Sequence, residues 1–215
     1  NVGAMGIENI NKLKLLSKEE FEKSIDFKLN KRNILVTYHP VTLEINSAKT
    51  HFQELLDAID ELEDTNIIIT KANSDPGGRV INSMIDNYVA KNYHKSIGFI
   101  SLGQLRYLSA MQHVDAIVGN SSSGIIETPS FKVGTINIGD RQKGRIKADS
   151  IIDCLPNKKS IRNAFKILYS QGFQSTLKNT KSPYGSGSAS KEIVEVLKTV
   201  ELYNIIKKSF HNINH

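Results

Sequence analysis

Polar, glycine-rich and basic residues form several short segments in this sequence, and each segment directly follows an apolar run. Glycine and serine dominate residues 119–124, and arginine, lysine and glycine dominate residues 139–145. Small residues let the backbone approach a ligand, and the N-terminus of a helix offers N–H groups to phosphate oxygens. Arginine binds the same oxygens with two parallel hydrogen bonds. The two segments therefore predict a site for an anionic, phosphate-bearing ligand.

The glycine- and serine-rich segment offers the hydroxyl groups of Ser121 and Ser122 and ends at the small residue Gly124. Glu127 follows within one helical turn, where a carboxylate can accept hydrogen bonds from two ribose hydroxyls. The segment is neither a Walker A motif nor a G-x-G-x-x-G motif. A serine helix cap followed by a glutamate that complements the helix dipole fits the same residues. Both interpretations are open at this point.

Two earlier segments place further polar side chains after apolar runs. His39 precedes Pro40, which holds residue 39 in an extended conformation, and its imidazole can donate to a phosphate or transfer a proton. Asn73 and Asp75 precede two glycines that open a helix at Arg79. These groups suit sugar hydroxyls, and they also suit a structural histidine and ordinary helix capping.

Arg141 in the basic segment is the candidate for a diphosphate, although an exposed basic loop has the same composition. The remaining histidines show no metal-ligand spacing with one another or with the single cysteine, Cys154. We therefore expect no metal and no cofactor. No complete nucleophile or acid–base pair is recognisable in the sequence, so a binding site is predicted more clearly than a catalytic one.

Short apolar runs rich in β-branched residues predict strands that are buried on both faces of a parallel sheet. They lie at residues 34–36, 67–69, 97–100, 116–118, 135–138 and 151–154. Apolar residues at helical spacing occur at residues 44–63, 79–93, 102–114 and 161–169, and a short helix follows residue 124. This alternation predicts an α/β fold with a doubly wound, Rossmann-like parallel sheet. Ligands bind at the carboxyl ends of such strands, which is where the polar segments fall.

The chain divides into three predicted parts. Residues 1–16 have the character of a tether, residues 17–200 form the Rossmann-like domain, and residues 201–215 belong to a C-terminal helix. The spacing of Ser17 and Glu20 is that of a capping box, so a helix starts there. The composition of residues 173–190 predicts a loop, and a late helix follows at residues 192–202.

The chain has 215 residues, and 28 basic against 22 acidic side chains give a net charge of +6. The excess favours an anionic partner, but the basic residues are scattered and lack the interleaved aromatic residues on which nucleic-acid bases stack. No apolar stretch is long enough to span a membrane, and the first residues do not have the pattern of a secretory signal. One cysteine excludes an internal disulfide framework. We expect a cytoplasmic protein with no nucleic-acid or membrane partner.

Two long motifs resemble the hydrolysing UDP-N-acetylglucosamine 2-epimerases of sialic acid biosynthesis: GNSSSGIIE at residues 119–127 and NIGDRQKGR at residues 137–145. Non-hydrolysing relatives have a Ser-Gly-Gly-x-x-Glu-Glu loop instead. Shorter agreements are His39-Pro40, Asn73-x-Asp75-x-Gly77, Tyr184-Gly185-x-Gly187 and the start at residues 3–10, which resembles the interdomain segment of the family. Family members are two-domain enzymes of the glycosyltransferase-B architecture, so the resemblance identifies this chain as similar to the C-terminal half.

The resemblance implies a role for each candidate residue. Phosphate is held by Ser121 and Ser122 beside Gly124, ribose by Glu127, and the diphosphate by Arg141. The backbone near Leu102 meets uracil, and His39, the candidate catalytic residue of this half, reaches the diphosphate and the sugar. The sugar side is lined by Asn73, Asp75 and Arg79.

The implied reaction has two steps and requires no metal. Loss of the C2 proton and of UDP gives a glycal-like intermediate, and water then adds at C1 while C2 is reprotonated on the opposite face. The products are UDP and N-acetylmannosamine. A close variant acts on a UDP-linked diacetamido-trideoxyhexose on the route to legionaminic acid, and a glycosyltransferase of the same architecture is a further alternative. Most acid–base carboxylates belong to the missing N-terminal domain, so we expect this chain alone to be inactive and the full-length protein to be a homo-oligomer.

Overall fold

The computed structural model describes residues 1–41, 47–73, 77–203 and 206. Within them one six-stranded, all-parallel sheet has the order β3-β2-β1-β4-β5-β6. The strands are β1 (Arg32–Thr37), β2 (Thr65–Thr70), β3 (Ser96–Phe99), β4 (Ala116–Gly119), β5 (Gly134–Ile138) and β6 (Ile151–Cys154). Each predicted strand is present, and the prediction of a doubly wound, Rossmann-like sheet is confirmed.

Two hydrophobic cores lie on the two faces of this sheet. Ile34 and Val36 of β1 belong to one core, whereas Leu35 between them belongs to the other. Every residue of β2 and β4 is buried. Side chains alternate across a strand, so a strand covered on both sides buries consecutive side chains and favours a continuous apolar run along its middle. This explains why continuous apolar runs predicted the strands correctly.

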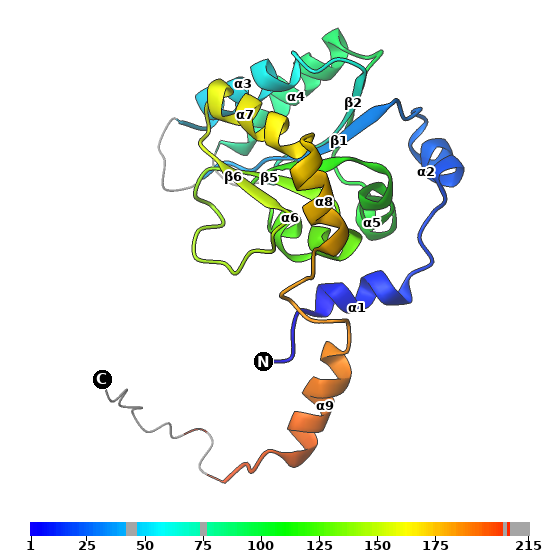
Figure 1. Ribbon diagram of the computed structural model, residues 1–215, viewed down its shortest axis with the longest axis vertical. Coiled ribbons are helices and arrows are strands. Elements are labelled where there is room, and N and C mark those ends of the chain that lie inside the picture. The colour runs from blue at the N-terminus through cyan, green and yellow to red at the C-terminus, as the bar shows by residue number, and fades with distance from the viewer. Residues whose placement is uncertain (42–46, 74–76, 204–205, 207–215) are drawn as a thin grey trace.

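Helices cover both faces of the sheet (Figure 1). The first core is covered by α3 (Ser47–Ile59), α4 (Gly78–Lys91) and α7 (Lys158–Leu168), and the second by α2 (Lys18–Ile25) and α5 (Gly103–His113). Short α6 (Ser122–Ile126) and the 3-10 helix η1 (Thr128–Phe131) connect β4 to β5. None of the helices in the described part of the chain is long and apolar enough to cross a membrane.

The helix signals in the sequence are largely confirmed. Ser17 and Glu20 form the predicted capping box, with 3.2 Å from the Glu20 N–H to the Ser17 hydroxyl and 2.8 Å for the reciprocal bond. The helices predicted at 79–93, 102–114 and 161–169 correspond to α4, α5 and α7. Residues 44–46 of the predicted helix at 44–63, and most of the predicted C-terminal helix, lie outside the described residues.

The predicted loop over residues 173–190 is wrong in its first part, where the chain forms α8 (Gln171–Asn179). Ser170 caps this helix by accepting a hydrogen bond from the Phe173 N–H at 3.3 Å. Phe173 packs against the first core, and Leu177 is also buried. Two apolar anchors and a cap are therefore sufficient to order a segment whose composition is that of a loop.

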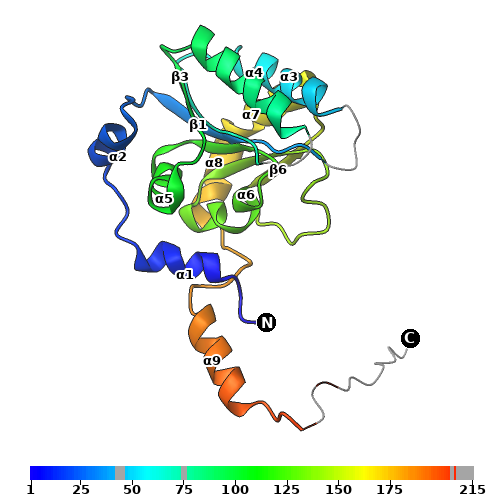
Figure 2. The same ribbon diagram turned by 180° about the vertical axis from the view of Figure 1, so that it is seen from behind.

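Residues 1–16 contain a helix, α1 (Met5–Lys12), that docks on α9 (Ala189–Thr199). Glu8 pairs with Lys12 and accepts hydrogen bonds from the Ser190 N–H at 2.9 Å and the Ser190 hydroxyl at 2.5 Å. The bond from Lys12 and those from Ser190 lower the pKa of Glu8 to about 2. From its contact with α1, helix α9 extends away from the sheet, as both views show (Figures 1 and 2).

Candidate functional site at the carboxyl edge of the sheet

Strand order reverses between the neighbouring strands β1 and β4, which is where open α/β sheets bind ligands. A cavity of about 380 Å³ lies at this edge, and its lining includes Thr37, His39, Leu102 and Ser121. A second cavity of about 140 Å³ adjoins it: the two cavities have three other lining residues in common, and Glu127 lines the second one. The fold therefore brings together candidate residues from three separate segments of the chain.

Asn120, which is 1% exposed, ties three of the loops together. Its side chain accepts a hydrogen bond from the His39 N–H and donates one to the His39 carbonyl, both at 2.8 Å. Its own carbonyl oxygen accepts from Arg141 Nη1 at 3.1 Å and from Gln142 Nε2 at 2.8 Å. His39 and Arg141 are thus held on either side of the glycine- and serine-rich loop, even though the Arg141 residue as a whole is exposed.

The His39 ring is oriented by the loop that follows β2. Its Nδ1 accepts a hydrogen bond from the Asn73 N–H at 3.3 Å. A neutral imidazole that accepts at Nδ1 carries its proton on Nε2. His39 is half-buried and lines the larger cavity, whereas Asn73 is exposed and is not among its lining residues. The predicted neighbourhood of His39 and Asn73 is present, while Asp75 lies outside the described residues.

The glycine- and serine-rich loop contains a helix cap, one of the two interpretations left open above. Ser121 is the N-cap residue of α6 and its hydroxyl accepts from the Ser123 N–H at 3.4 Å. Ser122 is the first residue of the helix and is half-buried. Gly124 packs so closely on β5 that a Cβ there would lie 2.9 Å from Thr135 Cγ2. The cap leaves Ser121 on the wall of the larger cavity, where it can still meet a ligand.

Glu127 ends α6 and lines the smaller cavity. Its Oε2 atom is buried and has no hydrogen-bond partner among the described residues. Burial raises the pKa of Glu127 above its usual value. Gly6 lies against the same carboxylate, because a Cβ at residue 6 would be 2.8 Å from Oε1. A buried acceptor without a donor, at the wall of a cavity, suits a ligand that brings hydroxyl groups.

We expect Glu127→Gln to raise the melting temperature of the unliganded protein at pH 7. The raised pKa means that the folded state disfavours the ionised carboxylate, a cost that is present above the folded pKa and absent below the ordinary value of 4.5. The gain should therefore shrink as the pH falls through that range. Thermal unfolding at several pH values checks this, with the exposed Glu201→Gln as the control. No gain at pH 7 would contradict the assignment of an uncompensated carboxylate.

Of the two predicted residues not yet described, one lines the larger cavity and one does not. Leu102, which is 2% exposed, precedes α5 and lines the larger cavity. Arg79 lies in the first turn of α4, is exposed, and is not among the lining residues of either cavity. No group of three or more potential metal ligands gathers among the residues that the structure describes.

Sequence reasoning missed several residues that build the site. Asn120 and Gln142 lie inside the two motifs, so their positions were visible but their roles as structural links were not. Tyr107 and Gln104 line both cavities, yet they lie within α5, where no local pattern marks them. Gly6 belongs to the segment that was predicted to be a tether.

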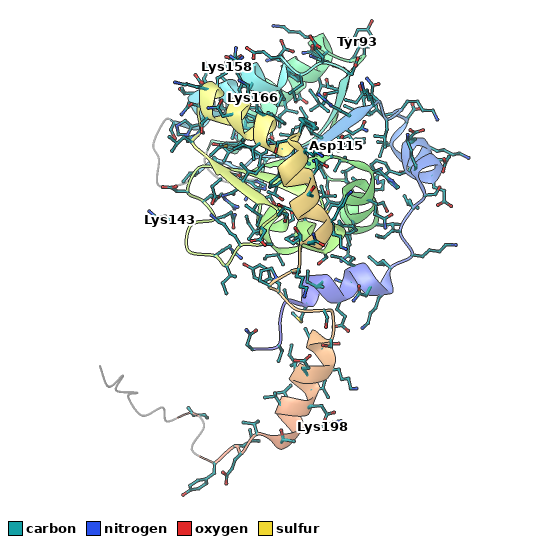
Figure 3. The ribbon with its side chains drawn as sticks, in the orientation of Figure 1. Tyr93, Asp115, Lys143, Lys158, Lys166 and Lys198 are labelled. Carbon is teal, nitrogen blue, oxygen red and sulfur yellow. The ribbon has the colours of Figure 1, made fainter. Side chains whose placement is uncertain are left out.

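A further cavity, of about 360 Å³, lies beside β5 and β6 and collects none of the predicted residues. Lys143 and Lys147 line it, and Lys147 forms an ion pair with Asp153 at 2.8 Å. Figure 3 shows Lys143 on the outer side of the loop after β5. The paired cavities at the β1–β4 edge are the candidate ligand site, because the hydrogen-bonded loops converge there.

Known proteins match this chain over nearly its whole length. The sequence model of the family described as UDP-N-acetylglucosamine 2-epimerase matches residues 1–198. The GDP/UDP-N,N'-diacetylbacillosamine 2-epimerase (hydrolyzing) of Campylobacter jejuni is 42% identical over 211 residues, which are 98% of this chain and 54% of that protein. The UDP-N,N'-diacetylbacillosamine 2-epimerase (hydrolyzing) of Legionella pneumophila is 32% identical over 95% of this chain and 52% of its own length.

The fold also matches solved structures. The UDP-GlcNAc 2-epimerase of Neisseria meningitidis, solved with UDP-GlcNAc, has a TM-score of 0.75 at 20% identity, over 93% of this chain and 55% of that one. The chain thus spans about half the length of the relatives it matches, and the match falls on their C-terminal half. By its sequence, this chain belongs to the UDP-N-acetylglucosamine 2-epimerase family.

Proposed function

We propose that this chain is the UDP-binding half of a hydrolysing 2-epimerase that acts on a UDP-linked N-acetylated sugar. The observation that carries the proposal is the convergence of the two family motifs on one edge of the sheet, where Asn120 joins the His39, Ser121 and Arg141 loops. The family match and the named activities of the two bacterial relatives support it.

Each candidate residue has a proposed role at this edge. Arg141 and the Ser121–Ser122 hydroxyls bind the diphosphate beside Gly124, and Glu127 accepts the ribose hydroxyls in the smaller cavity. Uracil lies against the backbone near Leu102. Asn73, Asp75 and Arg79 belong to the sugar side.

The proposed role of His39 follows from its tautomer. With Nδ1 accepting the Asn73 N–H, the proton on Nε2 makes the ring a donor. A donor at the diphosphate stabilises the negative charge that grows as UDP leaves C1. Loss of the C2 proton, and its return to the opposite face after water adds at C1, requires carboxylates that we place in the other half of the protein. We therefore expect this chain alone to bind UDP without turnover.

Two sugars are candidates for the substrate. The two relatives described above are named for diacetylbacillosamine, a diacetamido-trideoxyhexose, and this favours the UDP-diacetamido sugar. The description of the family favours UDP-N-acetylglucosamine, with UDP and N-acetylmannosamine as products. The full-length protein should release UDP and a free 2-epimer from one of these substrates. Transfer of the sugar to an acceptor, with no free epimer, would instead indicate a glycosyltransferase.

The apolar surface of α9 fits an arrangement in two domains. Val194, Val196 and Leu197 are between 44% and 68% exposed on a helix that extends away from the sheet. We propose that α9 and residues 201–215 pack against the other half of the full-length protein, and that residues 1–16 lead to it.

We also propose that the full-length protein is a homo-oligomer, which light scattering would test.

Binding of UDP tests the site directly. Arg141→Ala should weaken UDP binding about 10- to 100-fold, because a hydrogen bond to a charged group contributes about 1.5–3 kcal/mol. Calorimetry with the full-length protein measures this effect. The matched control is Lys143→Ala, which removes a cation from the same loop at the neighbouring cavity and should leave UDP affinity almost unchanged. Equal affinities for Arg141→Ala and the unmodified protein would refute the assignment of the diphosphate.

A further inference from the structure

Hydroxyl groups from four elements form a connected network behind the loop that follows β4. Thr70 Oγ1 lies 2.7 Å from Thr37 Oγ1, which lies 3.4 Å from the Tyr107 hydroxyl. The Tyr107 hydroxyl is 2.6 Å from Ser123 Oγ, and Ser123 Oγ is 3.0 Å from Ser121 Oγ. The network begins inside the sheet and ends at Ser121, on the wall of the larger cavity.

Relative acidity favours one direction of donation along the last three members, Tyr107, Ser123 and Ser121. The geometry of the short bond between Tyr107 and Ser123 allows either hydroxyl to donate. A phenol is a stronger acid than a serine hydroxyl, so Tyr107 is taken as the donor. Ser121 Oγ already accepts the Ser123 N–H at 3.4 Å, and the Ser123 hydroxyl, having accepted from Tyr107, donates to Ser121 in turn. The hydroxyl proton of Ser121 can then be donated to a ligand in the larger cavity. Each donation polarises the next one in the same direction.

Tyr107 is well placed to keep this direction constant. Burial raises the pKa of its phenol, and the hydrogen bond with Ser123 only partly offsets that effect. The phenol therefore retains its proton at physiological pH. Thr37 lies on the other side of the hydroxyl and limits its rotation. Tyr107 also lines both cavities, between the serine loop and Glu127.

We propose that Tyr107 is a positioning residue for the phosphate-binding loop, because its donation to Ser123 fixes the Ser121 hydroxyl as a donor toward an anionic phosphate oxygen. This inference rests on the proposed function, since it takes the anion to be the diphosphate of the nucleotide. Without the phenol, the Ser123 hydroxyl loses its donor, and the Ser121 proton can turn back toward Ser123 instead of the ligand.

Calorimetry of the full-length protein with UDP and with uridine tests the proposal, because uridine lacks the phosphates. Tyr107→Phe should weaken UDP binding about three- to tenfold, the effect of one hydrogen bond, and should leave uridine binding unchanged. Ser123→Ala removes the middle of the chain and should act in the same way. Tyr88→Phe is the matched control, since the Tyr88 hydroxyl contacts Asp60 at 3.4 Å within the other core, and it should change neither affinity.

A double substitution separates positioning from direct contact. If Tyr107 acts through Ser121, Tyr107→Phe should have no further effect on UDP affinity in a Ser121→Ala background. Additive losses would overturn the positioning role, and so would an equal loss of uridine and UDP affinity. Unchanged UDP affinity in Tyr107→Phe, with Arg141→Ala still weakened, would refute this inference alone. Absence of UDP binding in the unmodified protein would refute the proposed function instead.

Discussion

Replacing Gly119 with alanine is expected to lower the free energy of unfolding by about 3–5 kcal/mol, near the upper end for single substitutions. Gly119 has a φ of +137°, and an added Cβ would lie 2.0 Å from the Thr37 carbonyl oxygen. That oxygen accepts the Asn120 N–H at 3.2 Å, and Thr37 is paired with Gly119 between β1 and β4. The two strands must separate to make room, and the Asn120 link lies at that point.

Chemical denaturation measures the loss in Gly119→Ala. The matched control is Gly144→Ala, where φ is +83° but no atom lies within 4 Å of the added Cβ. That substitution brings only the backbone cost of a left-handed residue, about 1–2 kcal/mol. Similar losses in both variants would show that the contact with Thr37 is relieved without opening the strands, contrary to the argument above.

Asn120→Ala is expected to lower the free energy of unfolding by about 2–4 kcal/mol and to weaken UDP binding at least about tenfold. The substitution leaves the N–H and the carbonyl of His39 without their side-chain partners, and each such buried group costs about 1–3 kcal/mol. The His39 loop is then no longer held beside Ser121, so the effect on binding should exceed what lost stability alone explains.

Asn66→Ala is the matched control for this prediction. Asn66 is also buried, donates to the Lys28 carbonyl at 2.7 Å, and lies near the amino end of β2, away from the site. It should lower stability while UDP affinity stays the same. Denaturation and calorimetry on both variants separate the two effects, and a parallel loss of affinity in Asn66→Ala would argue against a specific role for Asn120.

The sheet was predictable because its signal is local. The strands β2, β4 and β5 are buried along their whole length, so their apolar, β-branched residues are continuous in the sequence. Ser17 and Glu20 mark a helix start by spacing alone. Helix α8 was not predictable in this way. Its order depends on the packing of Phe173 against the first core and on the burial of Leu177, while its composition is that of a loop.

The convergence of the polar segments at one edge of the sheet was predictable, but the hydrogen bonds between them were not. Parallel strands bring their carboxyl ends to one edge, so segments 119–124 and 139–145 had to lie together once the strands were known. The pairing of Asn120 with His39 joins residues 81 positions apart, and nothing near either residue indicates it. The contact of Gly6 with Glu127 is of the same kind.

The fold class, the family motifs and the residue types at the carboxyl edge follow from the sequence alone, because periodicity, capping and strand-end composition are properties of neighbouring residues. Which of those residues touch depends on packing. Packing joins His39 to Asn73 and Asn120, connects Tyr107 to Ser121 through Ser123, and leaves Glu127 Oε2 buried without a donor in the described chain. Such contacts arise only when distant segments pack, since the energy of a buried hydrogen bond depends on where its partner lies in space.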